Sequence, residues 1–306
     1  MSSRTPRIAI DGVLLLDKPV GLTSNAALQR VKRLFGAARA GHAGTLDPLA
    51  SGLLPIAFGE ATKLLRFTLD ADKRYTACVH FGVATATGDA EGQVIDRQPA
   101  DFTHAQLDDA LGRFVGVQWQ TPPRHAALKL RGRAYYDYAR AGEEIERTPR
   151  EVRIDSLALV EWAAPLATLD VACGKGTYVR VLAEDLGRSL NSVAHLAMLR
   201  RTAAGGFSVD DAISLETLEG SSIEQRMEGL LPPLALVEKQ PRIVLGDEEI
   251  DRFARGVKLS HTGSAPGIHV CLSPAGALIG LGDFDGAALR PIRVTHEAAF
   301  NAGLRK

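Results

Sequence analysis

Cysteine is scarce in this sequence of 306 residues: Cys78, Cys173 and Cys271 are widely spaced and form no CxxC pair. This spacing indicates neither a disulfide framework nor a zinc site. Long apolar runs are also missing, since no segment approaches the roughly 20 apolar residues needed to cross a bilayer. The start of the chain, MSSRTPR, lacks the apolar run of a secretory signal. We therefore expect no membrane association and a cytoplasmic location.

The sequence also lacks a net charge, because 36 Lys and Arg residues balance 36 Asp and Glu residues. Bulk attraction to a nucleic acid is therefore not indicated. The charges are nevertheless unevenly distributed. Residues 1–75 hold eleven basic against six acidic residues and residues 124–153 eight against five, whereas residues 208–251 hold eleven acidic against three basic residues. This asymmetry is compatible with one positive and one acidic face, as in a protein that binds RNA or another polyanion. Charges usually coat solvated faces, however, so the asymmetry alone is weak evidence for such a partner.

Hydrophobic residues make up 45% of the chain, enough for a large core, and the length predicts one sizeable domain followed by a smaller one. Apolar runs predict strands over residues 12–16, 75–83, 93–95 and 169–174. Helical spacing predicts helices that begin at a Ser24 cap, at Thr103, near residue 179 and at a Ser221/Glu224 capping box.

A domain boundary is expected just after Pro232 and Pro233. Beyond it, several short apolar pieces and one helix in under 70 residues predict a small β-barrel.

The stretch AGHAGTLDPLASG, residues 40–52, is expected to be a loop and places Asp47 directly before a proline. Because an Asp-Pro pair is a frequent turn starter, a turn carboxylate is the simplest interpretation. The glycines of the stretch also permit close approach of the backbone to a ligand, and His42 is a polar group able to stack. In that setting Asp47 is a candidate base, metal ligand or nucleophile, and the local sequence does not choose among these roles.

Two rival sites find no support in the spacing. The glycines lack both the Lys-Ser/Thr ending of a P-loop and a GxGxxG pattern. No second carboxylate or histidine lies at close metal-ligand spacing from Asp47. Asp89 and Glu91, in the segment TGDAEG, break the calcium-loop pattern early and are interpreted as turn residues.

A second glycine-containing segment, CGKGTYVR (173–180), contains Lys175 and ends in Tyr178 and Arg180. It is either a helix start with solvent-facing bases or part of a site in which Arg180 faces Asp47 and holds the carboxylate ionised. The run KLRGRAYYDYAR (129–140) mixes bases with aromatics, which suits both a surface for phosphates and stacked bases and an amphipathic helix that packs on the protein.

Together these segments resemble the TruB family of tRNA pseudouridine synthases, bacterial enzymes that isomerise the uridine at position 55 in the T loop. The segments that carry the resemblance span most of residues 10–210 in family order: GVLLLDKPVGLTS (12–24), AGHAGTLDPLASGLLPI (40–56), GEATK (59–63), DKRY (72–75), TGDAEG (87–92), LKLRGRAYYDYARAG (128–142), GTYVRVLAEDLG (176–187) and LRR (199–201). Beyond about residue 240 the likeness is looser, and the expected barrel resembles a PUA-type RNA-binding domain.

Carried over position by position, the resemblance implies that Asp47 is the catalytic nucleophile. It implies six further substrate-binding or pocket residues: His42, packing among the T-loop bases; Tyr75, stacking on the target uracil; Arg180, pairing with the aspartate; Tyr178 and Leu199, lining the pocket of the flipped base; and Lys18, whose part is structural first. In an otherwise apolar pocket Arg180 is expected to keep Asp47 charged.

The implied fold is α+β, with a pseudouridine synthase catalytic core over residues 1–235 built on a central mixed, mainly antiparallel sheet flanked by helices. A thumb-like insertion is expected over about residues 124–153 and a PUA-like RNA-binding β-barrel over residues 240–306. No metal and no organic cofactor are expected, because the isomerisation transfers no group and changes no oxidation state. The implied partner is the T stem-loop of tRNA, bound by a monomer without an obligate protein partner.

The sequence leaves two other function classes as alternatives. One is a non-catalytic RNA-binding or tRNA-folding protein on the same scaffold, which the joint presence of Asp47, Tyr75 and Arg180 disfavours. The other is a hydrolase with an aspartate nucleophile, for which no histidine partner is identifiable. The sequence departs from the family at Ala126-Ala127, where Ser-Ala is frequent, and this puts one polar RNA contact in doubt.

Overall fold

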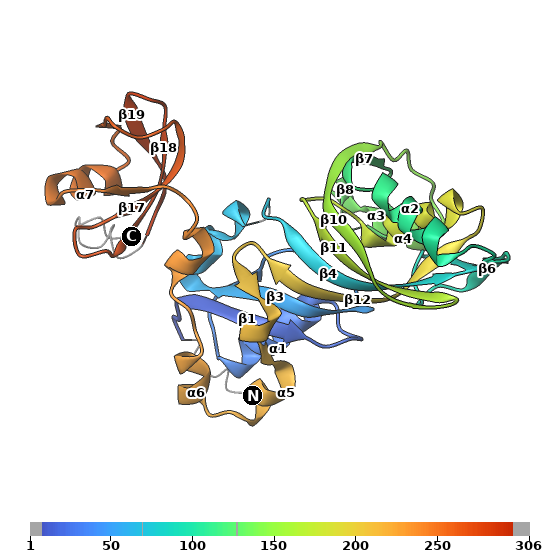
Figure 1. Ribbon diagram of the computed structural model, residues 1–306. Coiled ribbons are helices and arrows are strands. Elements are labelled where there is room, and N and C mark those ends of the chain that lie inside the picture. The colour runs from blue at the N-terminus through green and yellow to red at the C-terminus, as the bar shows by residue number, and fades with distance from the viewer. Residues whose placement is uncertain (1–7, 69, 127, 296–306) are drawn as a thin grey trace.

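The computed structural model describes residues 8–68, 70–126 and 128–295 (Figure 1). The segment MSSRTPR, Ala127 of the expected insertion and residues 296–306 of the expected barrel lie outside the described residues. One large sheet dominates the described part. Its strands are β1 (Gly12–Lys18), β2 (Ala40–His42), β3 (Ala50–Phe58), β4 (Lys73–Phe81), β7 (Gly116–Gln120), β10 (Arg150–Ala163), β11 (Leu166–Cys173), β12 (Ala194–Ala204), β13 (Phe207–Ser208) and β14 (Ile213–Ser214).

The strands of this sheet follow the order β14-β1-β3-β12-β4-β11-β10-β7, and β2 and β13 pair with β3 and β12 off this path. Strands β1/β14 and β3/β12 pair in parallel, while the other pairs are antiparallel. The expected mixed, mainly antiparallel sheet is therefore confirmed. The parallel pairing of β12 with β3 matters for the site, because it joins Leu199 to Ala50, three residues after Asp47.

Helices cover one face of the large sheet. They are α1 (Ser24–Leu34), α2 (His104–Arg113), α4 (Val179–Ser189) and α5 (Leu215–Gly220), and each contributes buried residues to one core with the sheet. Strand β1 shows why its sequence is an uninterrupted apolar run. Leu14 and Leu16 belong to this helix-covered core, whereas Val13 and Leu15 belong to a second core on the other face. Because successive side chains of a strand point to opposite faces, both sets must be apolar.

A second, smaller sheet lies to one side of the large one, at the opposite end from α2 and α4 (Figure 1). Its strands follow the order β15 (Arg242–Val244), β17 (Gly267–Leu272), β18 (Leu278–Phe284), β19 (Ala288–Val294) and β16 (Leu259–Ser260), next to helix α7 (Asp247–Ala254). Phe253 of α7 packs in a core within this unit. Val270 and Leu281 instead join the second core together with Val13 and Leu53. The domain limits and the RNA-binding role expected for this unit remain predictions.

Shorter elements complete the described part of the chain. They are the hairpin β5 (Val83–Thr85) and β6 (Val94–Arg97), the insertion elements β8 (Lys129–Leu130), β9 (Arg133–Ala134) and α3 (Tyr135–Arg140), helix α6 (Ile223–Glu228), and the 3-10 turns η1 (Gly59–Lys63), η2 (Leu65–Phe67), η3 (Val209–Asp211) and η4 (Pro233–Val237). The insertion leaves the sheet after β7 and returns to it at β10, the neighbouring strand. No helix in the described ranges is long and apolar enough to span a bilayer.

Three local predictions are wrong in detail. Thr23, not Ser24, caps α1, since its side chain accepts a hydrogen bond from the backbone N–H of Ala26. The capping box before α6 is formed by Ser222 and Gln225, one residue later than expected. The expected loop 40–52 begins and ends in strands β2 and β3, because small residues there still pair as a ladder.

Candidate active site

Asp47 lies in the segment that connects β2 to β3, and the chain fixes this segment from both sides. The buried hydroxyl of Ser24 accepts a hydrogen bond from the backbone N–H of Leu46 (2.7 Å) and donates to the carbonyl of Leu46 (3.0 Å). On the other side, the backbone N–H of Ala50 donates to the carbonyl of Asp47 (3.1 Å). The hydroxyl expected to cap a helix therefore positions the residue directly before the carboxylate.

The glycines of this stretch serve close packing within the protein. A Cβ at Gly52 would lie 2.3 Å from the carbonyl oxygen of Arg201, and the φ of Gly52 is +98°. A Cβ at Gly44 would lie 3.2 Å from the Arg201 guanidinium, and one at Gly41 would lie 2.9 Å from the side chain of Leu65. The close approach that the sequence suggested for a ligand is thus made by β12 and by the chain after β3.

Arg180, the second residue of α4, is the centre of the hydrogen-bond network around Asp47. One guanidinium nitrogen, Nη2, lies 2.9 Å from Oδ2 of Asp47 and donates to the carbonyl of His125 (3.0 Å). The other, Nη1, lies 3.3 Å from Oδ2 of Asp89 and donates to the carbonyl of Thr87 (3.2 Å). The Arg180 side chain is only 6% exposed. The expected pairing of Arg180 with Asp47 is therefore present. The two terminal nitrogens of the planar guanidinium each lie close to one carboxylate, Nη2 to that of Asp47 and Nη1 to that of Asp89.

Asp89 is more than the turn residue that its sequence suggested. Its side chain is 4% exposed and accepts hydrogen bonds from the hydroxyl of Thr87 (2.5 Å) and the backbone N–H of Glu91 (3.2 Å). Such bonds are typical of a turn, so that interpretation holds locally. The same carboxylate nevertheless faces inward, because Arg180 at the start of α4 donates a hydrogen bond to its second oxygen (3.3 Å).

The electrostatics of Asp47 reflect competing neighbours. Burial raises the pKa of Asp47 above its ordinary value, the positive charge of Arg180 opposes this rise, and the negative charge of Asp89 adds to it. The net direction is upward, so Arg180 limits the effect of burial on Asp47 without cancelling it. The Asp47 side chain remains 41% exposed, which leaves the carboxylate open to a ligand.

A cavity of about 390 Å³ opens beside Asp47 and brings together most of the expected site residues. Its lining includes Asp47, Tyr75, Tyr178, Arg180 and Leu199. Tyr75 points inward from β4, and burial raises the pKa of its hydroxyl above the ordinary tyrosine value. The cavity therefore combines one open carboxylate with two aromatic rings, a suitable arrangement for holding a planar base next to a reactive acid.

Two expected site residues lie outside this lining. His42 is half-buried in β2, and its Nδ1 has no hydrogen-bond partner among the described residues. Burial lowers the pKa of His42, and the charge of Arg201 acts in the same direction. Lys18 is fully buried and donates to the carbonyls of Pro19 (2.8 Å) and Leu22 (2.7 Å), while burial lowers its pKa to about 8. These bonds fit the structural part expected of Lys18.

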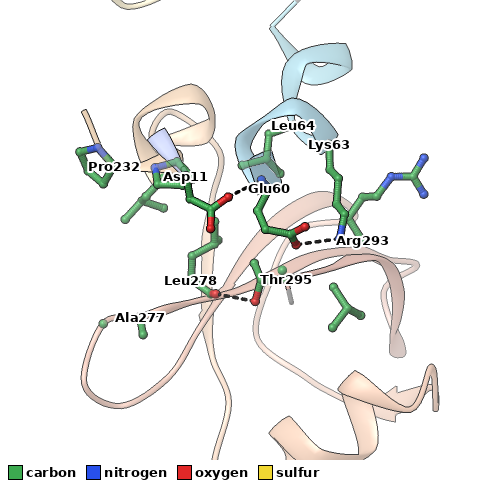
Figure 2. A pocket seen from close by; sticks show the side chains of 14 residues that line it. Asp11, Glu60, Lys63, Leu64, Pro232, Ala277, Leu278, Arg293 and Thr295 are labelled. Carbon is green, nitrogen blue, oxygen red and sulfur yellow. Dashed lines mark hydrogen bonds and ion pairs between the residues drawn. The ribbon is translucent and has the colours of Figure 1, made fainter. Parts of the chain in front are cut away.

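A different cavity, of about 580 Å³, lies between the large sheet and the C-terminal sheet. Figure 2 shows Asp11 and Glu60 of the first unit facing Leu278 and Thr295 of the second. Asp11 accepts a hydrogen bond from the backbone N–H of Glu60 (2.6 Å), and Glu60 pairs with Lys63 (2.7 Å). These polar groups are occupied by local partners. The smaller cavity, with its open carboxylate beside a buried arginine, is therefore the better candidate for chemistry.

The sequence reasoning missed Arg201. This residue is 1% exposed, and it donates to the carbonyls of Leu53 (2.7 Å) and Gly44 (3.1 Å). It also hydrogen-bonds the Tyr75 side chain from the neighbouring strand. The only signal in the sequence was its place in the LRR segment, because two adjacent arginines otherwise indicate a solvated surface. No cluster of three or more His, Cys, Asp or Glu side chains suited to a metal ion occurs in the part of the chain described by the structure.

Comparisons with known proteins agree on one family. The family models described as TruB family pseudouridylate synthase (N terminal domain) and tRNA pseudouridylate synthase B C-terminal domain match residues 32–179 and 180–236. The tRNA pseudouridine synthase B of Ralstonia nicotianae is 48% identical over 96% of this chain and 97% of its own length. The protein of the same name from Thiobacillus denitrificans is also 48% identical, over 94% of this chain and 97% of its own.

Solved structures show a similar fold. A chain in the crystal structure of a Cbf5-Nop10-Gar1 complex has a TM-score of 0.72 and 25% identity, covering 92% of this chain and 84% of that one. The two family models together cover every residue that lines the 390 Å³ cavity.

Proposed function

This chain belongs to the TruB family and isomerises uridine to pseudouridine in tRNA, and we propose that it does so at position 55 of the T loop with Asp47 as its nucleophile. The relatives that match over nearly their full length are tRNA pseudouridine synthases B. The alternatives of a non-catalytic RNA-binding protein and of a hydrolase are set aside on this ground.

One observation carries the assignment of Asp47. It is the carboxylate that is both aimed by a buried arginine, at 2.9 Å, and still 41% exposed to the cavity. Asp89, which shares the same arginine, is 4% exposed and has its oxygens engaged within the protein. A nucleophile must reach the substrate, so Asp47 is the reactive member of this pair and Asp89 its support.

The chemistry needs few groups. In the overall reaction the N1–C1′ glycosidic bond breaks, the uracil turns, a C5–C1′ bond forms, the proton of C5 is lost and N1 gains a proton, so substrate and product are isomers. The target nucleotide must leave the loop stack before it can react. We assign Tyr75 to stacking on the flipped uracil, Tyr178 and Leu199 to the walls of its pocket, and Arg180 to orienting Asp47.

The decisive experiment uses a T-arm stem-loop RNA labelled with tritium at C5 of its uridines. We expect release of tritium from one uridine, and we expect Asp47→Asn to abolish it while the dissociation constant for the RNA stays within about threefold, since the amide keeps the shape of the site. Asp96→Asn, on the exposed strand β6, is the matched control and should keep full activity. Release at another uridine would contradict the T-loop assignment, and an active Asp47→Asn variant would contradict the nucleophile.

Other assignments rest on the family and on the architecture. The substrate contacts of His42, the RNA-binding role of the insertion over residues 124–153, and the RNA-binding role of the C-terminal unit belong to this proposal. The C-terminal unit presents exposed Arg252, Arg255 and Arg290 on its surface, which suits contacts with phosphates. We further propose that the chain acts as a cytoplasmic monomer without an obligate protein partner.

A further inference from the structure

Tyr178 is held in place by the two residues at which the insertion leaves the sheet and returns to it. The backbone N–H of Tyr178 donates to the side-chain oxygen of Gln120 (2.9 Å), and the Gln120 amide donates back to the Tyr178 carbonyl (3.3 Å). Gln120 is the last residue of β7, is 2% exposed, and pairs directly with Arg150, the first residue of β10. The paired residues Gln120 and Arg150 thus lie next to the start of α4.

Arg150 holds the side chain of the same tyrosine. Its guanidinium carbon lies 4.9 Å from the centre of the Tyr178 ring, a cation–π contact. The guanidinium also packs on Gly176, where a Cβ would lie 3.3 Å from it, and donates from Nη2 to the Gly176 carbonyl. Gly176 has a φ of +82°, a conformation that favours glycine. The loop before α4 is therefore shaped around a flat guanidinium that covers Tyr178.

These contacts hold Arg150 in place although they leave one of its own donors without an acceptor. Its Nε is buried and has no hydrogen-bond partner in the described part of the chain. A buried N–H without an acceptor is costly, so its place beside Tyr178 calls for an explanation. Arg150 also lines the same cavity as Asp47 and Tyr178.

We propose that Arg150 is a positioning residue for the isomerisation, which acts by holding the Tyr178 ring, and with it the wall of the base pocket, in the reactive arrangement. The assignment rests on the proposed function of Tyr178 as part of that wall. This role requires no contact between Arg150 and the RNA phosphates. Its contribution therefore belongs to the reaction step and not to affinity.

The test compares Arg150→Ala with the remote control Arg113→Ala, which removes an exposed arginine at the end of α2. Single-turnover tritium release should be slowed about 10- to 100-fold by Arg150→Ala, the size expected for a small misplacement of a pocket wall. The dissociation constant and the slope of its logarithm against the logarithm of salt concentration should stay unchanged. A slope reduced by about 0.7 to 0.9 would identify a lost phosphate contact and overturn the proposal.

Two further variants test whether Arg150 acts through Tyr178. Arg150→Lys keeps the charge but lacks the planar face, so its rate should stay at least about tenfold below that of the unmodified protein. In a Tyr178→Leu background the added Arg150→Ala should change the rate by less than about threefold, because coupled residues are not additive. Full rescue by lysine, or multiplicative effects in the double variant, would overturn the proposal.

The outcomes also separate this proposal from the proposed function. Thermal unfolding of each variant shows whether a lost rate reflects a lost fold. Normal release by a folded Arg150→Ala overturns the role of Arg150 alone. Absence of release at the T-loop uridine in the unmodified protein overturns the proposed function, and the role of Arg150 with it.

Discussion

Replacement of Asp89 by asparagine should change two measurable properties of the site: the rate of the reaction, through the hold on Arg180, and the pKa of Asp47, through the loss of a nearby charge. Asp89 and Asp47 bind opposite ends of the same guanidinium, at 3.3 and 2.9 Å. An asparagine keeps the shape and can still accept the hydrogen bond from Thr87. It removes one negative charge from a pair whose side chains are 4% and 6% exposed. The substitution therefore weakens one side of the network without emptying it.

The size of the effect follows from the geometry. At 3.3 Å and an effective dielectric constant of about 20, two unit charges attract by about 5 kcal/mol, most of which offsets their desolvation. The net value of a hydrogen bond to a charged group is about 1.5–3 kcal/mol. If the whole of this loss appears in the transition state, the rate falls about 10- to 150-fold. Arg180 keeps Asp47 as a partner, so the protein should remain folded.

The pH dependence gives the sharper signature. Burial raises the pKa of Asp47, Arg180 opposes the rise, and the charge of Asp89 adds to it. Asparagine removes the contribution of Asp89, so the pKa of Asp47 should fall. A reactive carboxylate must be ionised, and the rate is lost as pH drops through its pKa. In the Asp89→Asn variant the acid limb of the pH–rate profile should therefore move to lower pH while the plateau falls.

Single-turnover tritium release, measured from about pH 5 to pH 8 with saturating RNA, reads both quantities. Asp96→Asn makes the same chemical change on an exposed strand and should alter neither. An acid limb that moves to higher pH would show that the charge of Asp89 does not raise the pKa of Asp47. A plateau equal to that of the unmodified protein would show that Asp89 does not support Asp47 through Arg180.

Two substitutions test how the Asp47 segment is held. Gly52→Ala places a Cβ 2.3 Å from the Arg201 carbonyl at a φ of +98° and should destabilise the protein by more than about 2 kcal/mol. The control Gly112→Ala, at a site in α2 with open space, should instead stabilise it by about 0.5–1 kcal/mol. A loss of stability of similar size in both variants, measured by thermal unfolding, would contradict the argument that Gly52 is needed for close approach of β12. Ser24→Ala leaves the backbone N–H of Leu46 without its 2.7 Å acceptor and should lower the free energy of unfolding by about 1–3 kcal/mol and also lower activity. Asn25→Ala, on the exposed side of α1, should change neither stability nor activity. A Ser24→Ala variant as active as the unmodified protein would show that the segment is held by other contacts.

Much of the framework was predictable because it depends on local patterns. The apolar run of β1 indicates a strand buried on both faces, and the spacing of apolar residues in α1 and α4 indicates one covered face each. Strand β12 was not predicted. Its sequence AHLAMLRRTAA contains two adjacent arginines, and its pairing with β3 and β4 joins residues more than 100 positions apart. Such pairing leaves no local pattern.

In the site, too, some residues were predictable from the sequence and others were not. Asp47, Tyr75, Tyr178, Arg180 and Leu199 were predicted from a resemblance, and the structure brings them to one cavity. The partners that place them were not predicted, because their burial is a tertiary property. Asp89 lies 91 positions before Arg180, and nothing in TGDAEG distinguishes an acid that turns inward from one in water. Arg201 and Arg150 likewise look like surface bases in the sequence, because their contacts with β3 and with the loop before α4 join segments distant along the chain.

The contacts of Arg180 explain why the local sequence around Asp47 could not determine its role. The guanidinium binds the segment after β2 through Asp47, the β5–β6 hairpin through Asp89 and the insertion through the carbonyl of His125. Each of these segments supplies one or two acceptors, and a guanidinium is held rigidly when its donors are satisfied from several directions. The guanidinium that faces Asp47 is therefore held by two further segments distant in sequence, the β5–β6 hairpin and the insertion. The orientation of the Asp47 carboxylate depends on this assembly around one arginine, and we expect a change in any of these segments to affect it.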